Sequence, residues 1–239
     1  MTTMPQEADN YIFTGTCRAG SGVVAAVTSY LAERNCYICA LEQFDDDSTN
    51  KFFMRAVFRP QDGSPSIDDI RGSFNQVSDT FAMDWNIHDP KVPVKTLIMV
   101  SKYDHCLDDI LYRRRKGEFN MEITAVVSNH VDLRAMVERE GIPFIHLPIT
   151  KDTKAQQEQR LLEIVDETGT ELMVLARYMQ ILSNELSAQL SGRCINIHHS
   201  FLPGFKGAKP YHQAYERGVK VIGATAHYVT SDLDEGPII

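Results

Sequence analysis

Residues 194–203, CINIHHSFLP, alternate in character over the first five positions and then enter a loop that carries proline and glycine. A strand sends side chains i and i+2 to the same face. Asn196 and His198 are therefore expected to project together, with Ile195 and Ile197 in the core behind them. A carboxamide can hold a developing oxyanion, and an imidazole can donate or accept a proton. The pair is typical of an acyl-chemistry site, although a polar strand end that only satisfies backbone groups has the same pattern.

This stretch belongs to an alternation of strands and helices that fills the second part of the chain. Strands are expected at 95–100, 123–127, 143–147, 172–176, 194–198 and 221–229, and helices at 107–116, 132–140, 154–168, 183–190 and 209–217. The alternation predicts an α/β fold with a Rossmann-like, mainly parallel sheet and right-handed crossovers. Ligands of such sheets bind beyond the carboxyl ends of the strands, which is where Met179, His198 and Asp234 fall.

The first part of the chain has another pattern. Strands are expected at 11–16, 36–44, 51–58 and 83–88, helices at 23–34 and 67–81, and a turn at the acidic run 45–48. The order βαββαβ is ferredoxin-like. Two prolines interrupt the pattern at 88–93 and predict a linker there. The expected domains are 9–90 and 91–239.

Composition excludes several functional classes. A net charge of −8 provides no electrostatic footprint for nucleic acid. No stretch approaches the roughly 20 apolar residues of a membrane span, and residues 1–10 lack the apolar core of a signal peptide. Five cysteines are an odd number, and the pair Cys36 and Cys39 lies in an expected strand without zinc-binding partners, which favours free thiols. These features predict a cytoplasmic protein without nucleic-acid or membrane partners.

Three separated blocks resemble the folate-dependent formyltransferase family: NIHHSFLP at 196–203, GATAHYVT at 223–230 and DLDEGPII at 232–239. The resemblance implies an active site of Asn196, His198 and Asp234. Within this family, the double histidine and the run GAKPYHQA at 207–214 are most similar to the formyltetrahydrofolate deformylase branch. That branch hydrolyses 10-formyltetrahydrofolate to formate and tetrahydrofolate, which supplies formate to one-carbon metabolism and purine biosynthesis. The family continues beyond Ile239, so the chain is expected to be shorter than its relatives at the C-terminus.

The resemblance also implies roles for individual side chains. Water would attack the formyl carbon while Asn196 and protonated His198 hold the oxyanion. Asp234 would either orient His198 or accept the proton of the water, and the sequence leaves both roles open. His227 would brace Asp234 or be a structural histidine. For His199 we expect a structural or water-positioning role, because strand alternation turns it away from the Asn196 face unless the strand has already ended.

A second loop concerns the substrate. Residues 178–183, YMQILS, resemble the pterin-binding loop of the family, although they also fit an ordinary strand-to-helix turn. The resemblance implies that five residues bind substrate: Met179, Gln180, Leu182, His227 and Thr230. Folate is then the substrate, and no separate cofactor is expected. No metal is expected either, since adjacent histidines cannot both face one ion from one strand face and no HExxH motif is present.

Another loop, 101–106, SKYDHC, bears on which acceptor takes the formyl group. Glycinamide ribonucleotide transformylases carry a glycine-rich loop here that cradles a phosphate. This chain has no glycine in the loop, and Asp104 and Asp108 would repel a phosphate, which favours water as the acceptor. Two alternatives remain: formyl transfer to an amine such as glycinamide ribonucleotide, and a non-catalytic folate- or amino-acid-sensing regulator. The intact proton-transfer set argues against the regulator.

The first block, 9–90, resembles an ACT domain, a small module that pairs edge to edge and often binds amino acids. The resemblance implies a homo-oligomer and an amino-acid effector bound by the loop 17–23, through Arg18, Gly20 and Gly22. Deformylase relatives usually carry Cys-Pro-Asp near the start of this loop, and Arg18-Ala19 departs from that. A purely architectural role for the block is therefore an equal alternative.

Overall fold

The computed structural model describes residues 10–47, 50–150, 152–205, 207 and 209–239. The chain divides between Val92 and Pro93 into two compact units, and the expected linker at 88–93 contains this division. Residue 9, with which the first domain was expected to begin, lies outside the described residues. Each unit has its own sheet and its own core.

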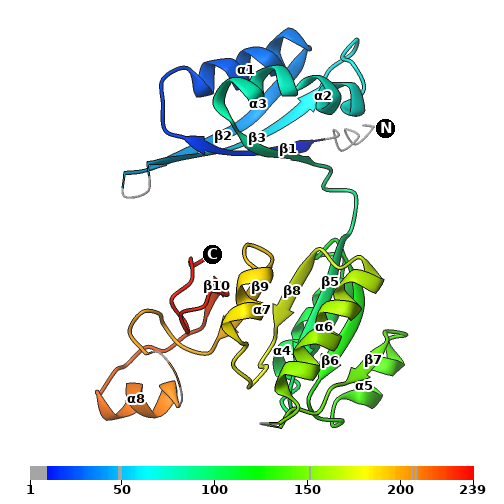
Figure 1. Ribbon diagram of the computed structural model, residues 1–239, viewed down its shortest axis with the longest axis vertical. Helices are drawn as coiled ribbons and strands as arrows, with labels where there is room; N and C mark the ends of the chain where they lie inside the picture. The colour runs from blue at the N-terminus through cyan, green and yellow to red at the C-terminus, as the bar shows by residue number, and fades with distance from the viewer. Residues whose placement is uncertain (1–9, 48–49, 151, 206, 208) are drawn as a thin grey trace, which may run out of the picture. The chain divides into compact units, whose positions relative to one another are not determined.

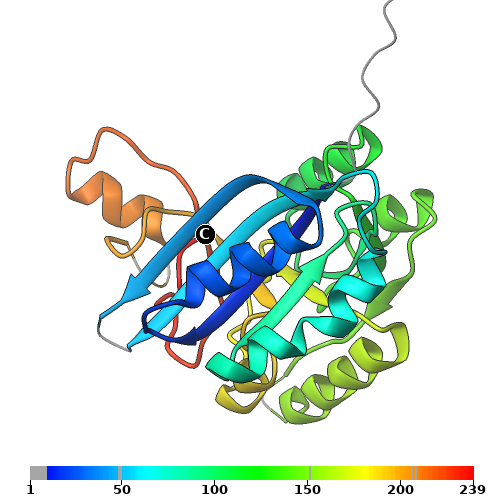
Figure 2. The ribbon, with the colours of Figure 1, turned by 90° about the horizontal axis from the view of Figure 1, so that it is seen from above.

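The first unit is a four-stranded antiparallel sheet with helices on one face (Figure 1, Figure 2). Its elements are β1 (Tyr11–Arg18), α1 (Val23–Glu33), β2 (Cys36–Asp46), β3 (Lys51–Pro60), α2 (Ile67–Ser73), α3 (Asn75–Phe81) and β4 (Asp84–His88). The strand order is β2-β3-β1-β4. With α2 and α3 counted as one interrupted helix, this confirms the predicted ferredoxin-like arrangement.

Alternation along β1 and β3 explains the core of this unit. Phe13 on β1 and Phe58 on β3 are fully buried on the helix-covered face. Val27 and Leu31, one helical turn apart on α1, are fully buried against them. Phe53, next to a buried position on β3, is 39% exposed on the opposite face. The sheet therefore has one covered face and one open face within the unit.

Two local predictions in this unit are wrong. The single helix expected at 67–81 is broken at Phe74, which is fully buried. Its ring packs against Tyr30 and Trp85 with centroids 5.0 and 4.6 Å away, and its N–H bonds Arg71 O at 3.3 Å, a tighter i→i−3 contact. We attribute the break to this anchored ring.

The turn expected at 45–48 begins later than predicted, because β2 continues past Phe44 to Asp46. Asp45 and Asp46 pair with Phe52 and Lys51 of β3 in the antiparallel ladder. Ser48, the last residue of the expected turn, lies outside the described residues. Cross-strand pairing therefore overrides the turn preference of the aspartates.

The second unit is a six-stranded sheet with the order β10-β9-β8-β5-β6-β7. Its elements are β5 (Val94–Val100), α4 (His105–Arg115), β6 (Met121–Ser128), α5 (Arg134–Arg139), β7 (Phe144–His146), α6 (Lys154–Thr168), β8 (Leu172–Leu175), α7 (Asn184–Gln189), β9 (Cys194–His198), α8 (Pro210–Glu216) and β10 (Thr225–Tyr228). All strand pairs are parallel except β9 with β10. The prediction of a mainly parallel α/β sheet is confirmed. The strand expected at 221–229 is shorter than predicted.

Helices cover both faces of this sheet, as Figure 1 shows for α6 and α4. Leu97 and Met99 of β5 share a buried cluster with residues of α6 and α7. Ile98 and Val100, which point the other way, share a cluster with residues of α4 and α5. Burial on both faces is why β5 reads as a continuous apolar run.

The topology brings three chain segments to one edge of the sheet. Because β8 and β9 are parallel neighbours, the loops after Leu175 and His198 emerge side by side. β10 returns antiparallel to β9 and places His227 opposite Asn196. Within the residues that the structure describes, no helix is both long and apolar enough to span a bilayer.

Candidate active site

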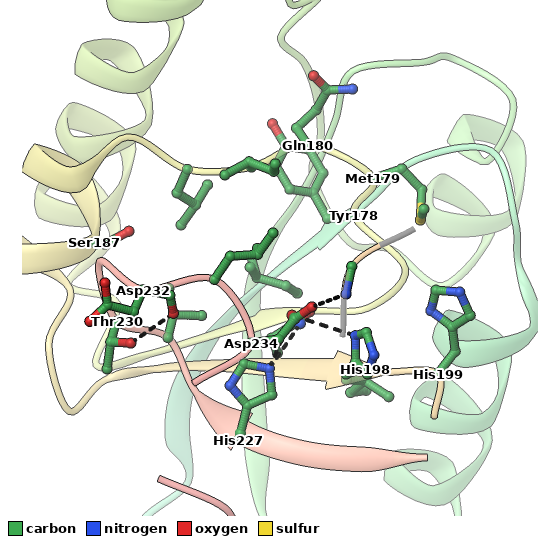
Figure 3. Close-up of a pocket in the computed structure, with 18 of the residues that line it drawn as sticks. Tyr178, Met179, Gln180, Ser187, His198, His199, His227, Thr230, Asp232 and Asp234 are labelled. Atoms are coloured by element: carbon green, nitrogen blue, oxygen red, sulfur yellow. Dashed lines mark hydrogen bonds and ion pairs between the residues drawn. The ribbon is translucent and has the colours of Figure 1, made fainter. Parts of the chain in front are cut away.

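The loops after β8, β9 and β10 enclose a cavity of about 280 Å³ (Figure 3). Eight predicted site residues line it together: Asn196, His198, Asp234, Met179, Gln180, Leu182, His227 and Thr230. Figure 3 shows His198, His227 and Asp234 facing one another, with Met179 and His199 on one side of the pocket and Thr230 on the other. The structure thus joins residues from three separate stretches of sequence.

β9 carries the central pair. Cys194 is fully buried and His198 is 5% exposed, with Asn196 partly buried between them on the same face. Ile195 and Ile197, which were expected in the core, are only partly buried. Because β9 lies one strand from the sheet edge, its isoleucine face is covered less completely than that of β5.

His198 has a defined proton arrangement. Its Nε2 lies 2.9 Å from the carbonyl oxygen of Phe205, and a carbonyl only accepts, so Nε2 carries a hydrogen. Its Nδ1 lies 3.5 Å from Asp234 Oδ1. The hydroxyl of Ser200 donates to the same carbonyl at 2.8 Å. Nδ1 is therefore the nitrogen that can exchange a proton with a ligand or with Asp234.

His227 is 2% exposed and contacts Asn196 directly. Its Nδ1 lies 2.9 Å from Tyr228 O and carries the hydrogen, which leaves a lone pair on Nε2 in the neutral ring. Asn196 Nδ2 lies 3.2 Å from that Nε2 and donates to it. The second N–H of Asn196 remains for another acceptor. His227 was expected either to brace Asp234 or to be structural, and the structure adds this contact with the carboxamide.

Asp234 is 7% exposed and lies between both histidines. Its Oδ1 is 3.5 Å from His198 Nδ1 and 3.7 Å from His227 Nε2. Its Oδ2 accepts a hydrogen bond from Gly207 N at 2.9 Å. A backbone φ of 57° places Asp234 in the left-handed region, which aspartate adopts more readily than most residues. The carboxylate is thus held by the backbone of the loop after β9.

The loop that carries Asp234 closes on β10 through Gly236. A Cβ added there would lie 1.7 Å from Tyr228 O, so only glycine allows this approach. Tyr228 N then donates to Pro237 O at 2.8 Å, and Ile239 N donates to Ala226 O at 2.9 Å. The DEGPII run therefore folds back along β10 and fixes the carboxylate above it.

His199 lines the pocket, as expected for the case in which the strand has already ended. β9 ends at His198, so strand alternation does not extend to the next residue. The His199 ring lies 5.4 Å from the Tyr211 ring and 5.4 Å from the His198 ring, centroid to centroid. Burial, with the nearby charge of Arg177, lowers the pKa of His199 to about 4. The ring is therefore neutral at neutral pH.

The loop after β8 presents apolar side chains to the pocket. Met179 is 52% exposed and Ile181 is 63% exposed. Met179 N donates to Ser101 Oγ at 3.0 Å, and Ser101 Oγ donates to Asn129 Oδ1 at 2.7 Å. The first residue of the predicted acceptor loop thus supports the predicted substrate loop.

Sequence reasoning missed several contributors to the site. Arg177, Ser187 and Leu233 line the pocket but were not predicted. A charged residue directly after an apolar strand was the available signal for Arg177. The backbone contacts of Phe205 and Gly207 leave no signal in the sequence, because every residue has a carbonyl and every residue except proline has an N–H.

The predicted regulatory residues lie elsewhere. Arg18, Gly20 and Gly22 are exposed in the first unit, and none lines this pocket. Gly22, with φ 90°, precedes the first residue of α1. Of the GAKPYHQA run, Ala208 lies outside the described residues, while Pro210 begins α8. Across the described residues, no group of three or more His, Cys, Asp and Glu side chains is placed to hold a metal ion.

Comparison with known proteins identifies the relatives of the chain. The formyl transferase family pattern matches residues 94–239. A formyltetrahydrofolate deformylase from a Corynebacterium species is 52% identical over 233 residues, covering 98% of this chain and 82% of the relative. The deformylase from Escherichia coli is 40% identical over 232 residues, covering 93% of this chain and 78% of the relative.

Solved structures agree with these relatives. A formyltetrahydrofolate deformylase from Burkholderia mallei superposes with a TM-score of 0.88 at 53% identity, over 97% of this chain and 82% of that one. Glycinamide ribonucleotide transformylase 1 from Symbiobacterium toebii gives 0.59 at 30% identity, over 64% of this chain and 74% of that one. The deformylase likeness extends over both units, whereas the transformylase likeness covers a smaller share. The chain belongs to the formyltetrahydrofolate deformylase family.

Proposed function

We propose that the pocket at the ends of β8, β9 and β10 hydrolyses 10-formyltetrahydrofolate to formate and tetrahydrofolate. The observation that supports this most is the contact series from Asn196 through His227 and Asp234 to His198 inside one cavity. The family activity is a hydrolysis, and these side chains provide a hydrogen-bond donor, a base and an acid in reach of one another. Folate is the substrate, and every step below uses only groups of this chain and water.

In the first step, the formyl oxygen binds to the free N–H of Asn196 and to Nδ1–H of protonated His198. Water attacks the formyl carbon and transfers a proton to Asp234. The negative charge that develops on the formyl oxygen is stabilised by donors that are already in place, which makes such donors effective. Asn196 suits this role because His227 holds its other N–H.

In the second step, the tetrahedral intermediate breaks its C–N10 bond. His198 Nδ1–H protonates the leaving N10, and formic acid forms and ionises to formate. The proton on Asp234 returns to His198 Nδ1 across their 3.5 Å contact. The reaction thus releases formate and one proton, and it restores both side chains.

The apolar loop after β8 binds the folate rings. Met179 and Ile181 expose apolar surface in the pocket, and ring systems gain affinity from such surface. Gln180, Leu182 and Thr230 line the same space. Polar atoms of the pterin would bond to backbone groups of this loop and to the side chains of Gln180 and Thr230.

Transfer to an amine is the alternative, supported by the transformylase likeness. Against it, the hydroxyl of Ser101 is engaged by Asn129 and Met179, and Asp108 occupies the first turn of α4. A phosphate at this end would meet a carboxylate where it needs N–H donors. Formate release from 10-formyltetrahydrofolate, assayed with and without glycinamide ribonucleotide, tests the choice. We expect a rate indifferent to the ribonucleotide, and stoichiometric formyl-glycinamide ribonucleotide would contradict hydrolysis.

The first unit serves as an oligomerisation surface, with an amino-acid effector as a further candidate ligand of its 17–23 loop. Tyr37 and Phe44 on the edge strand β2 are 51% and 64% exposed, and exposed strand edges favour pairing with another chain. Light scattering should show a homo-oligomer at assay concentration, and a monomer there and at about tenfold higher concentration would contradict this. The cysteines are free thiols, which supports a cytoplasmic location.

A further inference from the structure

Arg177, the second residue after β8, has a backbone conformation that is unfavourable for its side chain. Its φ is +60°, in the left-handed region that favours glycine. The backbone is fixed on both sides, because Ala176 N donates to Met99 O at 2.8 Å and Met179 N donates to Ser101 Oγ at 3.0 Å. The fold thus requires this conformation, and arginine is held in it although glycine would suit it better.

The guanidinium of Arg177 has unsatisfied donors. Its Nε and Nη1 are buried without a hydrogen-bond partner, and they are the only side-chain nitrogens or oxygens in this condition among the residues described. The guanidinium carbon lies 5.3 Å from the centroid of the Tyr103 ring. A buried donor without an acceptor costs free energy. Arg177 therefore lowers the stability of the unliganded fold twice, through its left-handed backbone and through its unpaired donors. Both features point to a ligand.

The pocket explains which ligand these donors suit. Arg177 lines the same cavity as Asn196, His198 and Asp234. Its charge reaches the pocket interior, since it helps to lower the pKa of His199. The carboxylate of Asp234 repels anions, and the positive charge of Arg177 in the same cavity offsets that repulsion. A guanidinium is the side chain whose geometry best matches a carboxylate.

We propose that Arg177 is the subsite that binds the carboxylate of the product formate. The inference rests on the proposed function, because formate is the anion which that reaction forms. The guanidinium of Arg177, which lines the cavity, donates to the formate oxygens once the C–N10 bond is broken. Arg177 then sets how tightly formate is retained, while Asn196 and His198 act on the formyl group.

The test is calorimetric titration of the full chain with sodium formate, at constant ionic strength and without folate. The key variants are Arg177→Met and Arg177→Gly. Arg134→Met is the matched control, because Arg134 also lies over an aromatic ring, 4.9 Å from the centroid of Phe144, but outside the pocket. We expect the formate Kd to rise by at least about tenfold in both Arg177 variants and to be unchanged in the control.

Thermal unfolding separates this from a structural role. If Arg177 binds product, Arg177→Gly relieves the left-handed backbone and unfolds at a temperature equal to or above that of the wild type. A purely structural cation would instead give a lower unfolding temperature with an unchanged formate Kd, and that result overturns the inference. No saturable formate binding by the wild type overturns it as well.

Turnover distinguishes the inference from the function on which it rests. Product inhibition by formate should weaken in Arg177→Met by the same factor as the Kd. If the wild type releases formate from 10-formyltetrahydrofolate while the variant keeps the wild-type formate Kd, the inference is wrong and the function stands. If the wild type releases no formate, the proposed function is wrong, and formate is then no longer supported as the ligand of Arg177.

Discussion

The two walls of the pocket are built in opposite ways. On the β9 and β10 wall, Asn196, His198 and Asp234 all have partners within the protein. On the wall formed by the loop after β8, Ile181 exposes apolar surface, and Arg177 has two buried nitrogens without partners. The side chains of the first wall are held in place before a ligand arrives, whereas two donors on the second wall have no partner without one.

The strand pairing explains this difference. Asn196 and His227 are directly opposite in the antiparallel ladder, where cross-strand side chains contact one another. The loop after β8 has no such neighbour and is held through its backbone, by Ser101. The geometry of Asn196 and His227 therefore comes from the sheet, whereas the exposed apolar surface of Met179 and Ile181 comes from a loop.

The largest expected effect follows from removing Asn196, the oxyanion donor on the β9 and β10 wall. Asn196→Ala should lower kcat by about 10²–10³, the usual scale for one such donor, with KM for 10-formyltetrahydrofolate nearly unchanged. Steady-state formate release measures both constants. Asn184→Ala, at an exposed asparagine on α7, is the control and should keep wild-type values. Wild-type turnover in Asn196→Ala would remove this side chain from the mechanism.

The next effect concerns His227, which we place behind Asn196 as a positioning residue. His227→Phe removes the acceptor of the carboxamide and should lower kcat by about tenfold to a hundredfold. His227→Gln offers a side-chain oxygen to the same N–H and should recover most of the activity. If His227 instead acts on the ionisation of Asp234, the pH profile of kcat would shift in both variants, and glutamine would not rescue.

The elements of this wall could be predicted only in part from the sequence. Alternation in CINIH and the apolar run of β5 are local signals, and both strands formed where expected. The antiparallel return of β10, which sets His227 opposite Asn196, depends on pairing between distant segments. The direction of His199 stayed open in the sequence, because one residue of strand length decides which way it faces.

The resemblance predicted which residues of the loop after β8 line the pocket, but it did not predict the positive charge of Arg177. The loop 178–183 lies in the pocket with the expected residues. Arg177 precedes it, and its importance depends on a left-handed φ and on buried atoms that lack partners. Neither property can be read from residue type, because they arise from how the surrounding backbone is fixed.

A smaller effect is expected from a change on the wall formed by the loop after β8. Ile181→Ser removes apolar surface that the folate rings would cover, and KM should rise by about fivefold with kcat retained. Because Ile181 is 63% exposed, the free energy of unfolding should change little. Ile222→Ser, at an isoleucine that is 56% exposed but outside the pocket, should leave KM unchanged. Equal KM values in both variants would place the folate rings elsewhere.

The smallest expected effect is the contribution of His199 to the change in the free energy of unfolding with pH. The pKa of His199 is lowered to about 4 from 6.5, by burial first and then by the charge of Arg177. Smaller contributions come from His198 and His105, which also lower the pKa, and from Asp234, which raises it. Between pH 6.5 and 4, the unfolded chain therefore binds a proton that the folded chain does not. Unfolding is favoured as the pH falls through this window, so this contribution to stability is present above pH 6.5 and is lost towards pH 4.

His199→Asn removes this titration, and the free energy of unfolding should then fall less steeply between pH 6.5 and 4. Urea denaturation at several pH values in that window measures the slope for each protein. His212→Asn is the matched control, since His212 is an exposed histidine on α8, and it should keep the wild-type slope. A His199→Asn slope equal to that of the wild type would mean that His199 binds a proton as readily in the folded chain as in the unfolded one. The ring would then belong to the solvent-facing edge of the pocket and not to its dry interior.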